Sequence, residues 1–97
     1  MSDFVYKIVD EGEWQAAIAS GSYKGSADDR RDGFIHLSTS SQLEGTLAKH
    51  FAGRDGLLLV AVEIPKIADR LKWEPARGGD LFPHLYAVLD PRLREAS

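Results

Sequence analysis

The chain has 97 residues and no cysteine, 43% of its residues are hydrophobic, 28% are charged, and its formal net charge is −3. This composition predicts a globular protein with a single domain over residues 1–97, and it excludes disulfides, thiolate metal sites and cysteine nucleophiles. The acidic balance argues against general nucleic-acid binding, and with no signal peptide and only short apolar runs we expect a cytoplasmic protein that does not bind membranes.

The first two predicted elements are a strand and a helix. Phe4–Val9 is rich in β-branched and aromatic residues, which is typical of a strand. Asp10 is a suitable helix N-cap with Glu13 three residues later, and Gly21 is a helix terminator. Helical spacing places three apolar residues on one buried face: Trp14, Ala17 and Ile18.

Residues 22–33 are predicted to form a loop, because they are polar, carry mixed charges and include two glycines. A loop of this length in a small domain is often functional. Tyr23 is its candidate site residue. Arg30 and Arg31 are interpreted as solvated, since three aspartates in the loop neutralise them: Asp28, Asp29 and Asp32.

A second strand, Phe34–Ser38, precedes a second helix. Strand alternation places Phe34, His36 and Ser38 on one face. The helix carries Leu43, Leu47, His50 and Phe51 along one stripe, and His50 is interpreted as structural or exposed. Its start is rich in hydroxyl groups that cap a helix, and free N–H groups at such a start can bind an anion; the candidates are Ser38, Thr39 and Gln42.

Three further strands complete the prediction. Leu57–Ile64 is apolar almost throughout, which predicts a central strand buried on both faces. Leu71–Glu74 is a brief strand in which Trp73 is interpreted as core and Glu74 as an exposed carboxylate. Leu81–Leu89 is the last strand, interrupted early by Pro83. The order β-α-β-α-β-β-β predicts an α+β fold with two helices on a mostly antiparallel or mixed sheet.

Two strands share one pattern of side chains. Phe34, His36 and Ser38 follow the same order of aromatic, imidazole and hydroxyl as the face formed by Phe82, His84 and Tyr86. If the two faces meet, they form an amphipathic pocket in which imidazoles bind a ligand or move protons. Two histidines satisfied within the core are the competing interpretation. No metal-binding spacing occurs, so we expect no metal.

Several motifs together resemble a known bacterial family. "VYKI", "GSYKGS", "DGFIHLSTSSQLEGT", "LKWE" and "FPHLYAVL" are similar to the domain-of-unknown-function family nine hundred and fifty-two, nearly from end to end. Its members are often labelled glutathione S-transferase-related, although the order of elements here is not that of a thioredoxin fold. The resemblance implies an ADP-ribosyltransferase-like split β-sheet with two main helices.

That resemblance also implies a function and a set of site residues. It implies NAD as cofactor, a small nucleotide-like ligand, and an activity of the ADP-ribosyltransferase or 2′-phosphotransferase kind. His36 and His84 would be catalytic, and the ligand would contact Lys7, Tyr23, Ser38, Thr39, Gln42 and Tyr86. A non-catalytic domain that binds a small ligand, and a protein-interaction domain, stay open as alternatives.

Overall fold

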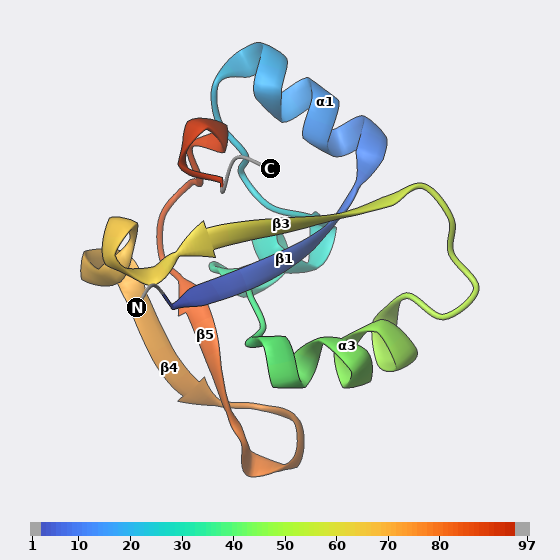
Figure 1. Ribbon diagram of the computed structural model, residues 1–97, viewed down its shortest axis with the longest axis vertical. Coiled ribbons are helices and arrows are strands. Elements are labelled where there is room, and N and C mark those ends of the chain that lie inside the picture. The colour runs from blue at the N-terminus through green and yellow to red at the C-terminus, as the bar shows by residue number, and fades with distance from the viewer. Residues whose placement is uncertain (1–2, 95–97) are drawn as a thin grey trace.

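The computed structural model describes residues 3–94, and Figure 1 shows how its strands and helices are arranged. The strands are β1 (Phe4–Asp10), β2 (Ile35–His36), β3 (Leu57–Glu63), β4 (Leu71–Pro75) and β5 (Leu81–Leu85). The α-helices are α1 (Glu11–Ser20), α2 (Ala27–Asp32) and α3 (Leu43–His50), and short 3₁₀ turns occupy Ser40–Gln42, Ile64–Lys66, Ala68–Arg70, Arg77–Gly79 and Pro91–Leu93. The predicted α+β class is confirmed.

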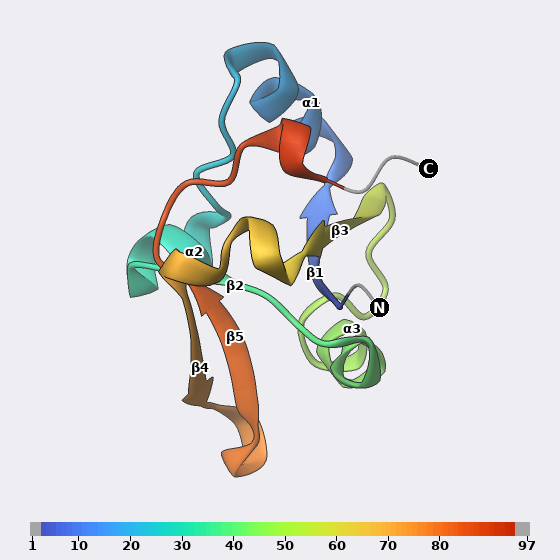
Figure 2. The same cartoon turned by 60° about the vertical axis from the view of Figure 1, so that its left-hand side comes forward.

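The strands form two small antiparallel sheets. β1 pairs with β3, and β5 lies between β2 and β4. Figure 2 shows the two sheets side by side, with α2 next to β2. They are joined where β1 meets the segment after β2, because Tyr6 and Ser38 exchange backbone N–H···O bonds of 2.8 and 2.9 Å. This junction brings β1, β2 and β5 around a common space.

The corner between β1 and α1 follows the sequence prediction. The Asp10 carboxylate accepts a hydrogen bond of 3.1 Å from the Glu13 backbone N–H, which caps the helix. Gly21 ends it in the left-handed conformation. Of the predicted apolar face, Trp14 and Ala17 are buried, whereas Ile18 is exposed.

The hydrophobic core lies on the inner side of both sheets. Ile35 and Leu37 enter the core. His36 and Ser38, which alternate with them along the chain, point to the opposite side, as strand alternation predicts. Its other members come from β1, α1, β3 and β5 and from the segments that follow α1, β3 and β5: Val5, Val9, Trp14, Ala17, Tyr23, Val60, Val62, Ile67, Leu85 and Leu89. Among the described residues, no helix is long and apolar enough to cross a membrane.

The prediction of a loop over residues 22–33 is wrong for α2. Ser26 Oγ accepts from the Asp29 backbone N–H at 3.3 Å, and Asp29 Oδ2 accepts from the Ser26 backbone N–H at 2.9 Å. These reciprocal bonds form a capping box that starts a short helix. The aspartate in the place of the usual glutamate or glutamine concealed this signal in the sequence.

Two strand predictions also need correction. β3 lies at the edge of a two-stranded sheet, and Leu59 on it is 57% exposed, so this strand is not buried on both faces. β5 ends at Leu85, short of the predicted Leu89, and it continues through the buried Pro83. Trp73 on β4 is half-exposed and does not belong to the core.

Helix α3 is more open than its apolar stripe suggested. None of its residues is buried, and Leu47 is exposed. The face formed by Thr46, Lys49 and His50 lines a cleft instead of the core.

Candidate functional site

A cleft of about 290 Å³ lies where the two sheets meet. Its walls come from β1, α2, α3 and β5, together with the end of β2 and the residues directly after it. The polar side chains that carry its chemistry are Lys7, Asp29, His36, Ser38 and His84. The cleft thus brings together segments that are far apart in the sequence.

Asp29 is the centre of the hydrogen-bond network in this cleft. Its side chain is only 1% exposed, and Lys7 Nζ lies 2.9 Å from its Oδ2. His36 Nδ1 lies 2.6 Å from Oδ1, and the His36 backbone N–H donates to the same oxygen at 3.1 Å. Gly25 passes close by, because a Cβ at that position would lie 2.6 Å from Asp29 Cβ.

These contacts keep the Asp29 carboxylate charged. Burial raises the pKa of Asp29, but the hydrogen bond from His36 and the charge and hydrogen bond of Lys7 outweigh that effect. The net result is a pKa well below the usual range of an aspartate. Lys7 and Asp29 therefore form a buried ion pair that fixes β1 to α2.

His36 lies between two carboxylates. Its Nδ1 faces Asp29, and its Nε2 lies 3.0 Å from Asp32 Oδ2. The hydrogen bond from Arg31 is the main cause of the lowered pKa of Asp32. Each ring nitrogen of His36 therefore has a carboxylate oxygen within hydrogen-bond distance.

His84 has a different environment. Its side chain is 7% exposed, and its Nδ1 lies 2.9 Å from Glu74 Oε1. Tyr86 donates a hydrogen bond of 2.6 Å to the same Glu74 oxygen. The hydrogen bonds from Tyr86 and then His84 lower the pKa of Glu74. Because a carboxylate can only accept, Nδ1 is the donor in this contact, and in the Nδ1–H tautomer Nε2 is an acceptor.

Phe34 holds the two imidazoles in place. Its ring stacks on His84 with the centroids 4.1 Å apart, and it lies 4.5 Å from His36. His36 and His84 are cross-strand partners on β2 and β5, and their ring centroids are 5.6 Å apart. The expectation that both imidazoles face one hollow is therefore confirmed as geometry.

The other predicted site residues divide into two groups. Lys7 and Ser38 line the cleft with the histidines, and Ser38 Oγ lies 3.0 Å from Thr46 Oγ1. Thr39 and Gln42 lie outside its lining: Gln42 Oε1 accepts from the Thr39 N–H at 3.0 Å, and Gln42 Nε2 donates to the Leu81 carbonyl at 2.8 Å. These two side chains close the turn before α3.

Tyr23 and Tyr86 also lie outside the lining of this cleft. Tyr86 supports it indirectly through Glu74. Tyr23 belongs to the core, where its ring packs against Trp14 with the centroids 5.5 Å apart. Its backbone N–H donates a hydrogen bond of 2.7 Å to the Leu89 carbonyl, which fixes this residue outside the histidine cleft.

Sequence reasoning missed two carboxylates that organise the site. Asp29 was interpreted as one of three aspartates that neutralise the arginines, yet its partners are Lys7 and His36. Glu74 was interpreted as an exposed strand residue, yet it orients His84. The capping-box spacing of Ser26 and Asp29 is the signal that could have located the first. For Glu74 the sequence offered no signal beyond its place on a strand.

Together, the fold and the cleft define a small α+β domain with two antiparallel sheets and a cleft lined by two carboxylate-bound histidines. The family model described as "Protein of unknown function (DUF952)" matches residues 8–93. The chain therefore belongs to this family, as its motifs predicted.

Three solved structures of protein CC0527 from Caulobacter crescentus are similar to this chain at 47% sequence identity. Its crystal structure and that of a double mutant each have a TM-score of 0.92, covering 96% of this chain and 82% of the other. The solution NMR structure has a TM-score of 0.85 and is covered over 80% of its length. No curated protein matches the chain.

Proposed function

We propose that the cleft binds NAD or a related nucleotide, and that the domain is an ADP-ribosyltransferase-like transferase acting on ADP-ribose or phosphate. His36 and His84 are its catalytic residues in this proposal. The observation that carries it is their arrangement: the rings lie 5.6 Å apart, both line one cleft, and each Nδ1 faces a carboxylate. The two separate sheets beside the cleft are compatible with the split sheet that the family resemblance implies.

The two imidazoles are suited to complementary tasks. His36 is held at Nδ1 by Asp29, and a ribose or leaving group that replaces Asp32 at Nε2 would receive a hydrogen bond or a proton from that nitrogen. His84, with Glu74 at Nδ1, offers Nε2 as an acceptor that orients a hydroxyl. Paired titratable groups in different environments are a usual basis for acid–base catalysis.

One cation of the cleft, Lys49, supports an anionic ligand. The lining carries three permanent cations, Lys7, Arg31 and Lys49, against three carboxylates, Asp28, Asp29 and Asp32. Lys49 is a suitable phosphate contact, because it makes no ion pair with any residue that the structure describes.

The volume limits how a dinucleotide would bind. A cleft of about 290 Å³ lies near the lower end of ligand pockets, which span roughly 300–1,000 Å³. It would hold one part of NAD, such as the ribose beside nicotinamide, and leave the rest outside. In this proposal Lys7 and Ser38 contact the enclosed part, and Thr39 and Gln42, outside the lining, contact the remainder.

Titration calorimetry with NAD, ADP-ribose and ribose 2′-phosphate tests binding, and glutathione serves as the control ligand. Nicotinamide release from NAD then tests catalysis. We expect Lys49→Gln to weaken binding about tenfold, and Lys66→Gln, which removes the same charge away from the cleft, to leave it unchanged.

The variants His36→Gln and His84→Gln separate the alternatives. Loss of nicotinamide release with binding retained supports catalysis. Binding without any nicotinamide release in the unaltered protein favours a non-catalytic binding domain. If none of the nucleotides binds and the variants only lower the melting temperature, the histidines are structural and the proposal is wrong.

A further inference from the structure

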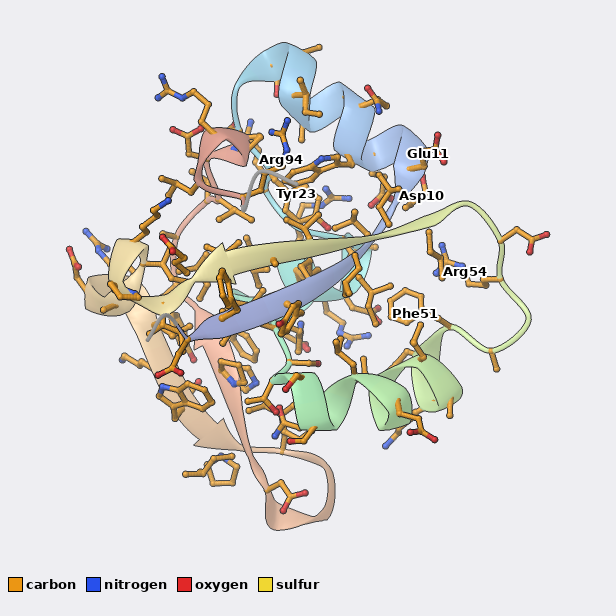
Figure 3. The ribbon with its side chains drawn as sticks, in the orientation of Figure 1. Asp10, Glu11, Tyr23, Phe51, Arg54 and Arg94 are labelled. Carbon is orange, nitrogen blue, oxygen red and sulfur yellow. The ribbon has the colours of Figure 1, made fainter. Side chains whose placement is uncertain are left out.

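A second hollow of about 230 Å³ lies beside the histidine cleft. The two hollows share lining residues on β1, α2 and α3, including Ser26, Asp28 and Phe51. The second hollow extends toward α1, where its further lining residues are Asp10, Glu13, Tyr23 and Arg54. Figure 3 shows Asp10, Phe51 and Arg54 near the end of β1, with Tyr23 below α1.

Tyr23 contributes a polar group without a partner. The residue is 3% exposed, and its hydroxyl is buried without a hydrogen bond to any described residue. The residue cannot easily turn outward, because Trp14 packs on its ring and its backbone exchanges two hydrogen bonds with Leu89. A buried hydroxyl without a partner is costly, so a ligand group that bonds to this oxygen would offset that cost.

The charges around this hydroxyl are mainly negative. Burial raises the pKa of Tyr23 most, followed by the charges of Asp29 and Glu13. The hydroxyl is therefore protonated at neutral pH, and its oxygen can accept a hydrogen bond. Glu13 makes no ion pair with the residues that the structure describes.

The hollow already accommodates one cation at its rim. Arg54 lies 3.9 Å from Asp10, and its guanidinium is 5.2 Å from the centre of the Phe51 ring. Three carboxylates line the hollow, from Asp10, Glu13 and Asp28, against this one arginine. The excess of negative charge favours a further positive group.

We propose that this second hollow binds the protonated amine of a small ligand. The ammonium group donates a hydrogen bond to the Tyr23 hydroxyl, and Glu13 provides the opposing charge. Ile8, Val9 and Phe51 contact the alkyl part of the ligand. This site is independent of nucleotide binding in the cleft, although a ligand here would lie next to the histidines.

Trp14 provides a direct measurement of occupancy, because its ring lies 5.5 Å from that of Tyr23. Trp73→Phe makes Trp14 the one tryptophan of the chain. The full chain with this substitution is titrated with n-butylammonium chloride at constant ionic strength, and n-butanol is the uncharged control. We expect a saturable change in Trp14 fluorescence with n-butylammonium and none with n-butanol.

Two variants test the contacts. Tyr23→Phe removes the hydroxyl and retains the ring, and Glu13→Gln removes the charge; each should weaken n-butylammonium binding at least fivefold. Glu11→Gln is the matched control, since Glu11 lies on the same helix turn but does not line the hollow. We expect Glu11→Gln to bind n-butylammonium with the same affinity as the protein that carries Trp73→Phe alone.

The proposal is wrong if n-butanol gives the same response as n-butylammonium, or if Glu11→Gln and Glu13→Gln weaken binding equally. It is also wrong if a crystal grown with n-butylammonium contains only a water molecule at the Tyr23 hydroxyl. If Tyr23→Phe does not fold, the comparison of Glu13→Gln with Glu11→Gln alone tests the proposal.

Discussion

His36 and His84 lie opposite each other on β2 and β5, and their ring centroids are 5.6 Å apart. Their carboxylate partners come from different directions, Asp29 from α2 and Glu74 from β4. One ring is thus held by a buried carboxylate and the other by a partly exposed one. The two imidazoles therefore have different environments, and each can be tested separately at its carboxylate.

Glu74→Gln should change the tautomer of His84. The carboxylate can only accept, so it fixes a proton on Nδ1, whereas an amide can also donate to Nδ1. We expect nitrogen-15 NMR to show mainly the Nδ1–H form in the unaltered protein and a larger Nε2–H fraction in the variant. Glu63→Gln, on β3, is the control. An unchanged His84 tautomer in Glu74→Gln would show that Glu74 does not position this ring.

Asp29→Asn should destabilise the whole domain. The substitution leaves Lys7 Nζ buried without an opposite charge, and breaking a buried ion pair in this way costs about 3–5 kcal/mol. Urea unfolding measures this loss. Lys7→Met combined with Asp29→Asn should lose less than the sum of the two single variants, because the pair is removed together.

Asp28→Asn is the control for that series, since its carboxylate is exposed and 3.4 Å from Arg31. It should change the unfolding free energy little, because exposed ion pairs contribute little. Equal losses for Asp28→Asn and Asp29→Asn would contradict a special role for the buried pair.

The pH dependence of stability should carry the signature of Asp29. Its pKa is lowered in the folded protein, so the unfolded chain binds this proton at higher pH than the folded chain does. The stabilisation is complete above the unfolded pKa of about 4 and is lost progressively as the pH falls below it. Urea unfolding between about pH 2 and pH 7 should therefore show a steeper acid loss for the unaltered protein than for Asp29→Asn. Parallel curves would refute this linkage.

Local patterns predicted much of the fold. Asp10 with Glu13 and Gly21 marked both ends of α1, and the alternation in residues 34–38 separated His36 from Ile35 and Leu37. Each of these signals depends on residues close in sequence. The pairing of the strands does not, and for this reason the apolar run at Leu57–Ile64 was assigned to a central strand, although the strand that it forms, Leu57–Glu63, lies at an edge.

The candidate site was predicted only in part for the same reason. Period-two spacing identified His36 and His84 on matching faces. The partners that orient them depend on contacts that no strand or helix spacing predicted: Asp29 lies seven positions before His36 and also reaches Lys7 across 22, and Glu74 reaches His84 across 10. Tyr23 was predicted as a site residue of the loop; the structure places its ring in the core, where it lines the second hollow.

Gly25→Ala should disrupt the site from the backbone. Gly25 has a φ of +102°, and an added Cβ would lie 2.6 Å from Asp29 Cβ, so the substitution combines backbone strain with a clash against the carboxylate that holds Lys7 and His36. Gly33→Ala is the matched control: Gly33 has a φ of +85°, but a Cβ there would meet nothing within 4 Å. Strain alone costs about 1–2 kcal/mol, and we expect Gly25→Ala to lose clearly more than that in urea unfolding. It should also shift the His36 ring resonances, which Gly33→Ala should leave in place. Similar losses in both variants would mean that the close approach of Gly25 to Asp29 does not constrain the site.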